Sequence, residues 1–319
     1  MTKNMAEYSI EAAVQHPEIT LETALCPVCG SEGAPRFEQR DLLCGLGGVF
    51  GQRYCSDCGV YFLSPRVPEN QIDGYYPESY APYREDPHPR LIRKLAGALG
   101  LTLRRRRIVE RFVQGGERFV PGGRILDVGC GNGSFLRSLA GGRWVRYAMD
   151  TKWHGGPDCP GAFYEGRFDH QAPPLAGLDA VPLWHVFEHL YHPERALQNA
   201  AAVLKPNGFL FLAIPDLQSL ERRLFGKYWI GWDPPRHVAT YSRRGIETLL
   251  QREGFRLVGV VPDVCTGEQI LLSIDFLLRS RGFRRQIHSS LVLRLLLAPL
   301  VFSLTRLGLA PAKVYVAQR

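Results

Sequence analysis

The segment Arg124–Phe135, RILDVGCGNGSF, combines an apolar strand, an acid, a glycine-rich turn and the start of a helix. Its first five residues have the β-branched and apolar character of a buried strand. Gly129, Gly131 and Gly133 then allow a tight turn and let a ligand approach without a Cβ in the way. Because open α/β sheets bind ligands at the carboxyl ends of their strands, this segment predicts a ligand site beside Asp127.

A second acid follows the next predicted strand, 145–149, which ends in Asp150. Its carboxylate is placed to hydrogen-bond a ribose diol, as the corresponding acid does in dinucleotide sites. Those sites usually have the spacing G-x-G-x-x-G, whereas this chain has G-x-G-x-G. Asp127 and Asp150 would together repel a pyrophosphate. The pair instead suits a nucleoside that carries a cationic centre and an amino-acid tail.

Two further segments, LDAVPLWHVFEHL at 178–190 and LKPNGFLFLAIPD at 204–216, complete a recognisable set. With them, residues 120–263 resemble the class I S-adenosylmethionine (SAM) methyltransferases. The resemblance implies a Rossmann-like, mostly parallel seven-stranded sheet whose antiparallel last strand lies at the C-terminus, and SAM as the cofactor. It also implies the cofactor-binding residues Asp127, Gly129, Cys130, Gly131, Asn132, Asp150, Thr151, Arg167, Phe168 and His185.

The apolar pattern of the same region alternates between strands and helices, which predicts a parallel, doubly wound α/β sheet. Strands are expected at 124–128, 145–149, 162–165, 179–186, 208–214, 256–262 and 313–317, and helices at 132–140, 193–204 and 243–253. The family usually has a helix between its second and third strands. Residues 151–161 are too rich in glycine and proline for one, so we expect this part of the adenine pocket to be walled differently.

Two C-x-x-C-G knuckles, Cys26 with Cys29 and Cys55 with Cys58, precede this region. Four thiolates at this spacing suit tetrahedral Zn²⁺, and a site filled by four cysteines is closed, so the metal is expected to be structural. A redox C-x-x-C would need a thioredoxin-like setting, which the sequence lacks. We therefore predict an N-terminal zinc ribbon.

Punctuation by proline and changes in composition divide the 319 residues into four parts. The predicted parts are a flexible lead-in at 1–25, the zinc ribbon at 26–63, a Pro/Tyr-rich linker with basic helices at 64–118, and the methyltransferase domain at 119–319 with insertions at 217–241 and 264–312. The first eleven residues carry charges and no long apolar run, so no signal peptide is expected and the eight cysteines are predicted to be cytoplasmic and reduced.

His185-Val-Phe-Glu188-His189 follows the strand expected at 179–186. His189 is the candidate base because an unperturbed imidazole titrates near neutral pH, and Glu188 is placed to orient it. The segment resembles the E-x-x-E-H of ubiquinone-biosynthesis O-methyltransferases, where the acids and histidine can hold a divalent metal; here His185 replaces the first acid, which leaves that metal open. It is also similar to the E-H pair of zinc-ribbon sugar C-methyltransferases, where the histidine acts as base. Alternatively, the pair only caps the next helix.

A second constellation, GWDPPRH at 231–237, lies in the predicted insertion that would cover the acceptor. It resembles a segment of bacterial zinc-ribbon methyltransferases tied to surface-polysaccharide or secondary-metabolite pathways. His237 is a further base candidate. The predicted substrate residues are Trp232, Asp233, Arg236 and Tyr241. The alternative is a loop that locks itself through an Asp233–Arg236 pair.

The net charge of +8 permits nucleic acid, anionic lipid or an acidic substrate as a partner. The run Arg104–Arg107 fits a solvated helix face better than a binding site. Arginines at 279, 281, 284 and 285 precede an apolar stretch, 291–304, that Arg294 and Pro299 interrupt; it is too short to span a bilayer. It fits either a lid or dimer face, or an amphipathic hairpin at 279–304 on a membrane surface.

Three functions agree with these patterns. The first is SAM-dependent methylation of a small molecule, with oxygen or carbon favoured over nitrogen as the acceptor atom. The second is RNA methylation, in which the zinc ribbon and basic surface recognise the RNA. Enzymes of that kind that methylate an exocyclic base nitrogen usually carry N/D-P-P-Y where this chain has residues 185–189, whereas those that modify carbon or a ring nitrogen escape this argument. The third is a non-catalytic SAM-binding scaffold, against which the full set of donor-site residues argues.

Overall fold

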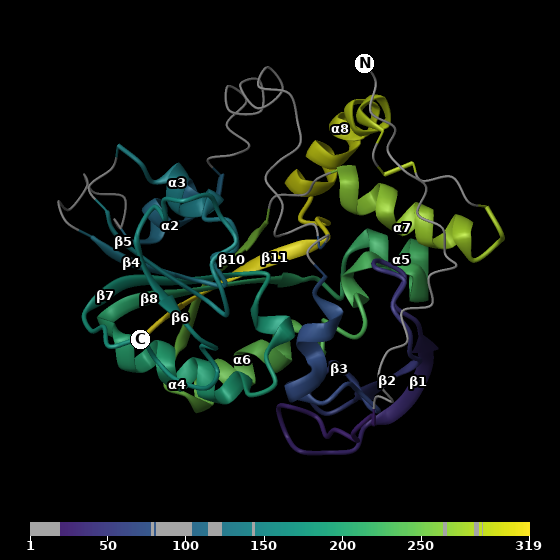
Figure 1. Ribbon diagram of the computed structural model, residues 1–319, viewed down its shortest axis with the longest axis horizontal. Coiled ribbons are helices and arrows are strands. Elements are labelled where there is room, and N and C mark those ends of the chain that lie inside the picture. The colour runs from purple at the N-terminus through teal and green to yellow at the C-terminus, as the bar shows by residue number, and fades with distance from the viewer. Residues whose placement is uncertain are drawn as a thin grey trace.

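The computed structural model describes residues 20–77, 80, 104–113, 123–141, 144–263, 267–283, 287–288 and 290–319. Most of the predicted lead-in, the 81–103 part of the predicted linker, and Arg284 with Arg285 lie outside the described residues. Figure 1 shows a large twisted sheet with helices on both faces, and a smaller sheet at one end.

The large sheet has seven strands in the order β10-β11-β8-β7-β4-β5-β6. Their bounds are β4 Arg124–Val128, β5 Val145–Asp150, β6 Ala162–Glu165, β7 Leu178–Trp184, β8 Leu204–Pro215, β10 Arg256–Pro262 and β11 Ala312–Gln318. The five strands from β6 to β8 pair in parallel, whereas β11 pairs antiparallel with both β8 and β10. The Rossmann-like sheet and its antiparallel C-terminal strand are therefore confirmed.

Helices cover the two faces of this sheet and bury its apolar strands (Figure 1). On one face lie α4 (Pro193–Val203) and α6 (Arg243–Arg252), and on the other α2 (Arg104–Val113) and α3 (Ser134–Ser138). The three helices expected in the methyltransferase region are found, each within two residues of its predicted bounds. No helix occupies the described residues 151–161, as their glycines and prolines predicted.

The smaller sheet has the order β1-β2-β3-β9. The first three strands come from the predicted ribbon: β1 Ala34–Gln39, β2 Phe50–Cys55 and β3 Val60–Leu63. The fourth, β9 (Ala239–Tyr241), comes from the 217–241 insertion and pairs antiparallel with β3. The ribbon region therefore shares a continuous sheet with the insertion and is not a separate module.

The arginine run lies in α2, where three of its four side chains contact the rest of the protein. Arg104 donates to the carbonyl of Pro262 at 3.1 Å, and Arg105 donates to Asp263 at 2.9 Å. Arg106 donates to Glu110 at 2.7 Å and to the carbonyl of Ser138. Only Arg107 is exposed. The predicted solvated face is therefore wrong for three of these arginines, because α2 packs against β7 and β8 on one face of the sheet.

The 264–312 insertion forms two packed helices, α7 (Gly267–Arg279) and α8 (Leu291–Arg306). α7 packs between α8 and α5 (Leu220–Phe225) (Figure 1). Within the described part of the chain, no helix combines the length and apolar character that crossing a membrane requires.

Candidate active site

A cavity of about 580 Å³ opens at the carboxyl ends of β4, β5 and β7. All ten residues predicted to bind the cofactor line it, which brings together segments from 127 to 185. Gly129, Gly131 and Gly133 have φ values of +66°, +53° and +75°, which L side chains rarely adopt. A Cβ on Gly129 would also lie 2.2 Å from Val186 Cγ2, so the turn depends on glycine for space as well as for backbone geometry.

The two strand-end carboxylates differ in their partners. Asp150 accepts hydrogen bonds from the backbone N–H of Gly131 at 2.8 Å and of Thr151 at 2.8 Å, which fixes it at the rim of the turn. Asp127 is 2% exposed, and its Oδ1 atom has no hydrogen-bond partner among the described residues. Burial raises the pKa of Asp127 well above its usual range. A cationic ligand in the cavity would satisfy this carboxylate, which fits the donor that the sequence predicted.

His185 is held with φ +57°, an unusual conformation for a residue with a side chain. Its Nε2 lies 2.9 Å from Asp263 Oδ2 and its Nδ1 lies 3.3 Å from Glu188 Oε1. Burial alone would lower the pKa of His185, but the bonds to these two carboxylates raise it to about 9. This raised pKa favours the cationic form of His185 at neutral pH, which makes it unsuited to act as a base.

His189 and His237 both line the cavity and pack edge-to-face against each other, with ring centroids 4.6 Å apart. Carbonyl groups accept from both rings: His189 Nδ1–H donates to Arg236 O at 3.0 Å, and His237 Nδ1–H donates to Gly231 O at 2.9 Å. The Tyr76 hydroxyl lies 2.9 Å from His189 Nδ1. A carbonyl oxygen can only accept, so each ring carries a proton on Nδ1, and its Nε2 keeps a lone pair when the ring is neutral.

Glu188 lies behind these rings and does not line the cavity. It is completely buried, its Oε1 is 4.0 Å from His237 Nε2, and its Oε2 has no hydrogen-bond partner among the described residues. One ligand atom from each of Glu188, His189 and His237 lies within 4.8 Å of the others, so this trio could also hold a divalent metal. His185, which replaces the first acid of the E-x-x-E-H metal motif, is directed at Asp263 instead.

The segment 231–237 is organised by a buried ion network. Arg236 is fully buried and forms two-point contacts with Asp233, at 2.6 and 2.9 Å, and with Asp41, at 2.7 and 3.1 Å. Its Nη1 also donates to the carbonyl of Tyr75 at 3.0 Å. The predicted alternative, a loop locked by an Asp233–Arg236 pair, is thus present. The network extends it to the loop after β1.

The four predicted substrate residues do not lie together on the cavity wall. Asp233 lines the cavity, whereas Trp232, Arg236 and Tyr241 do not. The Trp232 ring packs edge-on against Phe37 and Trp229, and Tyr241 packs on Phe187. These aromatic side chains therefore support the loop from behind.

Several cavity residues were not predicted from the sequence. Arg105 lines the cavity, stacks over the Trp184 ring at 4.9 Å and pairs with the fully buried Asp263. Asp263 could have been predicted from the sequence, because it is an acid directly after the strand expected at 256–262. Other unpredicted lining residues from the acceptor side are Leu43, Trp229, Ile230, Glu268, Gln269 and Leu272.

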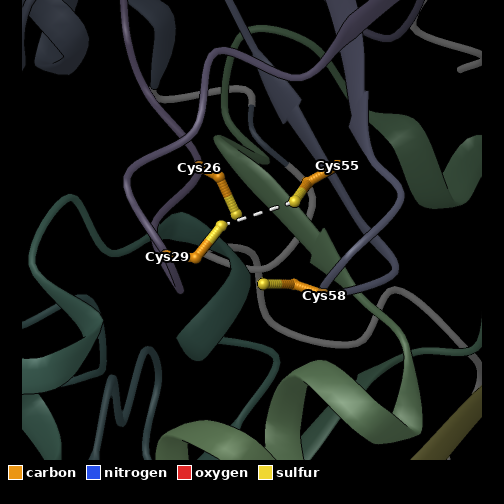
Figure 2. Close-up of side chains that lie close together, drawn as sticks. All are labelled: Cys26, Cys29, Cys55 and Cys58. Atoms are coloured by element: carbon orange, nitrogen blue, oxygen red, sulfur yellow. Dashed lines mark hydrogen bonds between the residues drawn. The ribbon is translucent and has the colours of Figure 1, made fainter.

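The four knuckle cysteines converge at one end of the small sheet, and Figure 2 shows their side chains directed toward one another. Their sulfur atoms all lie within 4.8 Å of one another, with Cys29 Sγ 3.5 Å from Cys55 Sγ. Cys26, Cys55 and Cys58 are buried and belong to the same apolar core as Tyr241 and the large sheet. The donor set and its compactness fit a tetrahedral zinc ion.

This fold and this cavity define the class of SAM-dependent methyltransferases. Residues 101–260 match the model of the methyltransferase domain family, and the chain belongs to that family. No curated protein matches the chain significantly.

Solved structures with a similar fold include two methyltransferases from named organisms. A SAM-dependent methyltransferase from Archaeoglobus fulgidus is 19% identical, with 71% of this chain and 94% of that chain covered and a TM-score of 0.45. Magnesium protoporphyrin IX methyltransferase from Synechocystis PCC 6803, solved with bound SAH, is 14% identical, with coverage of 78% and 97% and a TM-score of 0.47.

Proposed function

We propose that this methyltransferase acts on an oxygen or an acidic carbon of a small-molecule acceptor, such as a glycan, a lipid-linked molecule or a secondary metabolite. The observation that carries the proposal is the pair His189 and His237, which both line the cavity while backbone carbonyls hold their Nδ1 atoms. SAM, when bound, supplies a methyl group on a cationic sulfur that is already activated for displacement. The protein must therefore position the acceptor and remove its proton.

The proton-accepting step follows from the hydrogen bonds of the two rings. The carbonyls of Arg236 and Gly231 hold each Nδ1–H, which orients Nε2 for proton transfer. Once a ring has taken the proton, the buried Glu188 carboxylate stabilises the imidazolium without reaching the acceptor itself. Glu188 is thus assigned a positioning role, and His189 with His237 the role of base.

RNA methylation has less support from the geometry. The arginines of α2 that were candidates for RNA contact mostly pair within the protein, with Asp263, Glu110 and backbone carbonyls. The wall of the cavity near the two histidines contains Trp229, Ile230 and Leu272, which suits a compact acceptor with apolar parts.

Asp150 is assigned to the ribose hydroxyls of SAM. Replacing Asp150 with alanine removes charge-assisted hydrogen bonds worth about 1.5–3 kcal/mol, so we expect S-adenosylhomocysteine to bind roughly 10- to 150-fold more weakly by isothermal titration calorimetry. Asp158→Ala, an exposed acid outside the cavity, is the matched control and should bind normally. Unchanged affinity of Asp150→Ala would remove this assignment.

We assign Zn²⁺ to the four-cysteine cluster and expect elemental analysis to find one equivalent per chain. Because β3 pairs with β9 and three of the cysteines are part of the main core, metal loss should loosen the acceptor loop. Cys55→Ser is expected to lose zinc and several kcal/mol of stability, roughly a 10 °C fall in Tm. Cys44→Ser, outside the cluster, should keep both. Full zinc content in Cys55→Ser would contradict the site.

A further inference from the structure

The outer face of α8 is an exposed apolar patch. Seven large apolar side chains between residues 283 and 307 are 48–71% exposed: Phe283, Val292, Leu295, Leu296, Leu300, Phe302 and Leu307. Only four other large apolar side chains in the described residues are comparably exposed, and they are scattered at 25, 49, 145 and 224. Isolated exposed leucines need no explanation, but a contiguous patch of this kind marks an interaction surface.

The patch is not an unfinished part of the core. The opposite side of α8 is already packed, because Val301 and Leu304 are buried against α7 and Ala310. Val292, Leu295, Leu296 and Pro299 follow the i, i+3, i+4, i+7 spacing and form one stripe along the outward side. Figure 1 shows α8 on the far side of α7 from α5, at the periphery of the molecule.

The charges around the patch are cationic. In the described part of 267–307 both acidic side chains are engaged: Glu268 pairs with Arg294 at 3.0 Å, and the fully buried Asp275 accepts from two backbone amides. Arg281 and Arg306 are exposed, and the Arg306 guanidinium lies 4.7 Å from the centre of the Phe302 ring. An apolar face with a basic border fits the headgroup and upper acyl region of an anionic bilayer.

We infer that α8, with Phe283 and the basic side chains beside it, docks this protein onto an anionic membrane surface. A second copy of the chain fits less well, since a two-fold interface would bring the same basic border against itself. α7, which supports α8, also contributes Glu268, Gln269 and Leu272 to the acceptor side of the cavity. If the proposed function holds, the acceptor is an amphiphile that the membrane surface presents to the cavity; this extension rests on the proposed function.

Vesicle sedimentation tests the docking without any methyl transfer. Full-length protein should sediment with vesicles of phosphatidylcholine and phosphatidylglycerol, bind pure phosphatidylcholine much more weakly, and dissociate at high salt. Leu296→Glu with Leu300→Glu should weaken binding by about a hundredfold or more, the order expected for losing two buried leucines. Leu224→Glu is the matched control, because Leu224 is 67% exposed on α5 but lies away from the patch; it should bind like the wild type.

Three results would overturn the inference or its extension. Equal binding of the double variant and the wild type would remove α8 as the docking surface. The patch would instead be a self-interface if the wild-type protein does not bind anionic vesicles and light scattering finds it as a dimer, while the double variant is a monomer. If the protein binds the vesicles but methyl label from SAM enters only water-soluble products, the docking surface stands and the amphiphilic acceptor is excluded.

Discussion

Replacing both His189 and His237 with asparagine is expected to lower kcat by about 10²–10⁴-fold, the usual contribution of a general base. Asparagine keeps an N–H near the position of Nδ1, so the hydrogen bonds to Arg236 O and Gly231 O can persist while the Nε2 lone pairs are lost. Single-turnover methyl transfer measures the change. Binding of S-adenosylhomocysteine should stay within about twofold, because neither ring is assigned to the donor half.

The control for this experiment is His170→Asn. His170 is 47% exposed and pairs with Glu69 outside the cavity, so its loss should leave the rate unchanged. The two single variants then identify the ring that takes the proton. A double variant that retains the wild-type rate would exclude both histidines as the base and return Glu188 and His189 to a capping role.

The pH dependence gives a second check on His189. Burial and the neighbouring His237 lower the pKa of His189 to about 4. A base works only while it is unprotonated, so a rate that depends on His189 should hold through mildly acidic pH and fall only as the pH approaches 4. A rate that already falls around the ordinary imidazole pKa would assign the proton transfer to another group.

The donor half of the cavity could be predicted from the sequence because its residues are local to strand ends. Asp127 and the three glycines follow β4, and Asp150 ends β5, so the parallel arrangement alone brings them to one edge. The three glycines also occupy positions where the backbone has positive φ values, a conformation that favours glycine. A short contiguous motif thus predicts the turn and Asp127, and the end of the next strand predicts Asp150.

The acceptor half could not be predicted in the same way, because long-range packing decides it. Arg105 belongs to a run that looks like a solvated helix face, and only the docking of α2 on the sheet brings it to Asp263, 158 residues later. Trp232 and Arg236 stand in a motif typical of acceptor loops, yet both are buried. Their position depends on β9 joining the ribbon sheet, a pairing between segments about 180 residues apart.

Arg236→Ala is expected to destabilise the protein by about 3–5 kcal/mol, because it leaves Asp41 and Asp233 buried without their counterion. Burial alone would raise the pKa of Asp233, and it is the Arg236 charge that lowers it, so the carboxylate depends on this partner. Urea unfolding followed by fluorescence measures the loss. Arg243→Ala is the matched control, since its pair with Glu247 is on the surface and should contribute less than about 1 kcal/mol.

The network also predicts how the loss can be repaired. If the cost comes from uncompensated charge, Arg236→Met combined with Asp41→Asn and Asp233→Asn should recover a large part of the stability, because no buried charge then lacks a partner. The Arg236 network connects the loop after β1, the carbonyl of Tyr75 and the acceptor loop. A triple variant that recovers stability but not activity would show that the ion network also positions the acceptor loop for the reaction, in addition to stabilising the fold. A triple variant no more stable than Arg236→Ala would assign the loss to packing of the guanidinium instead of its charge.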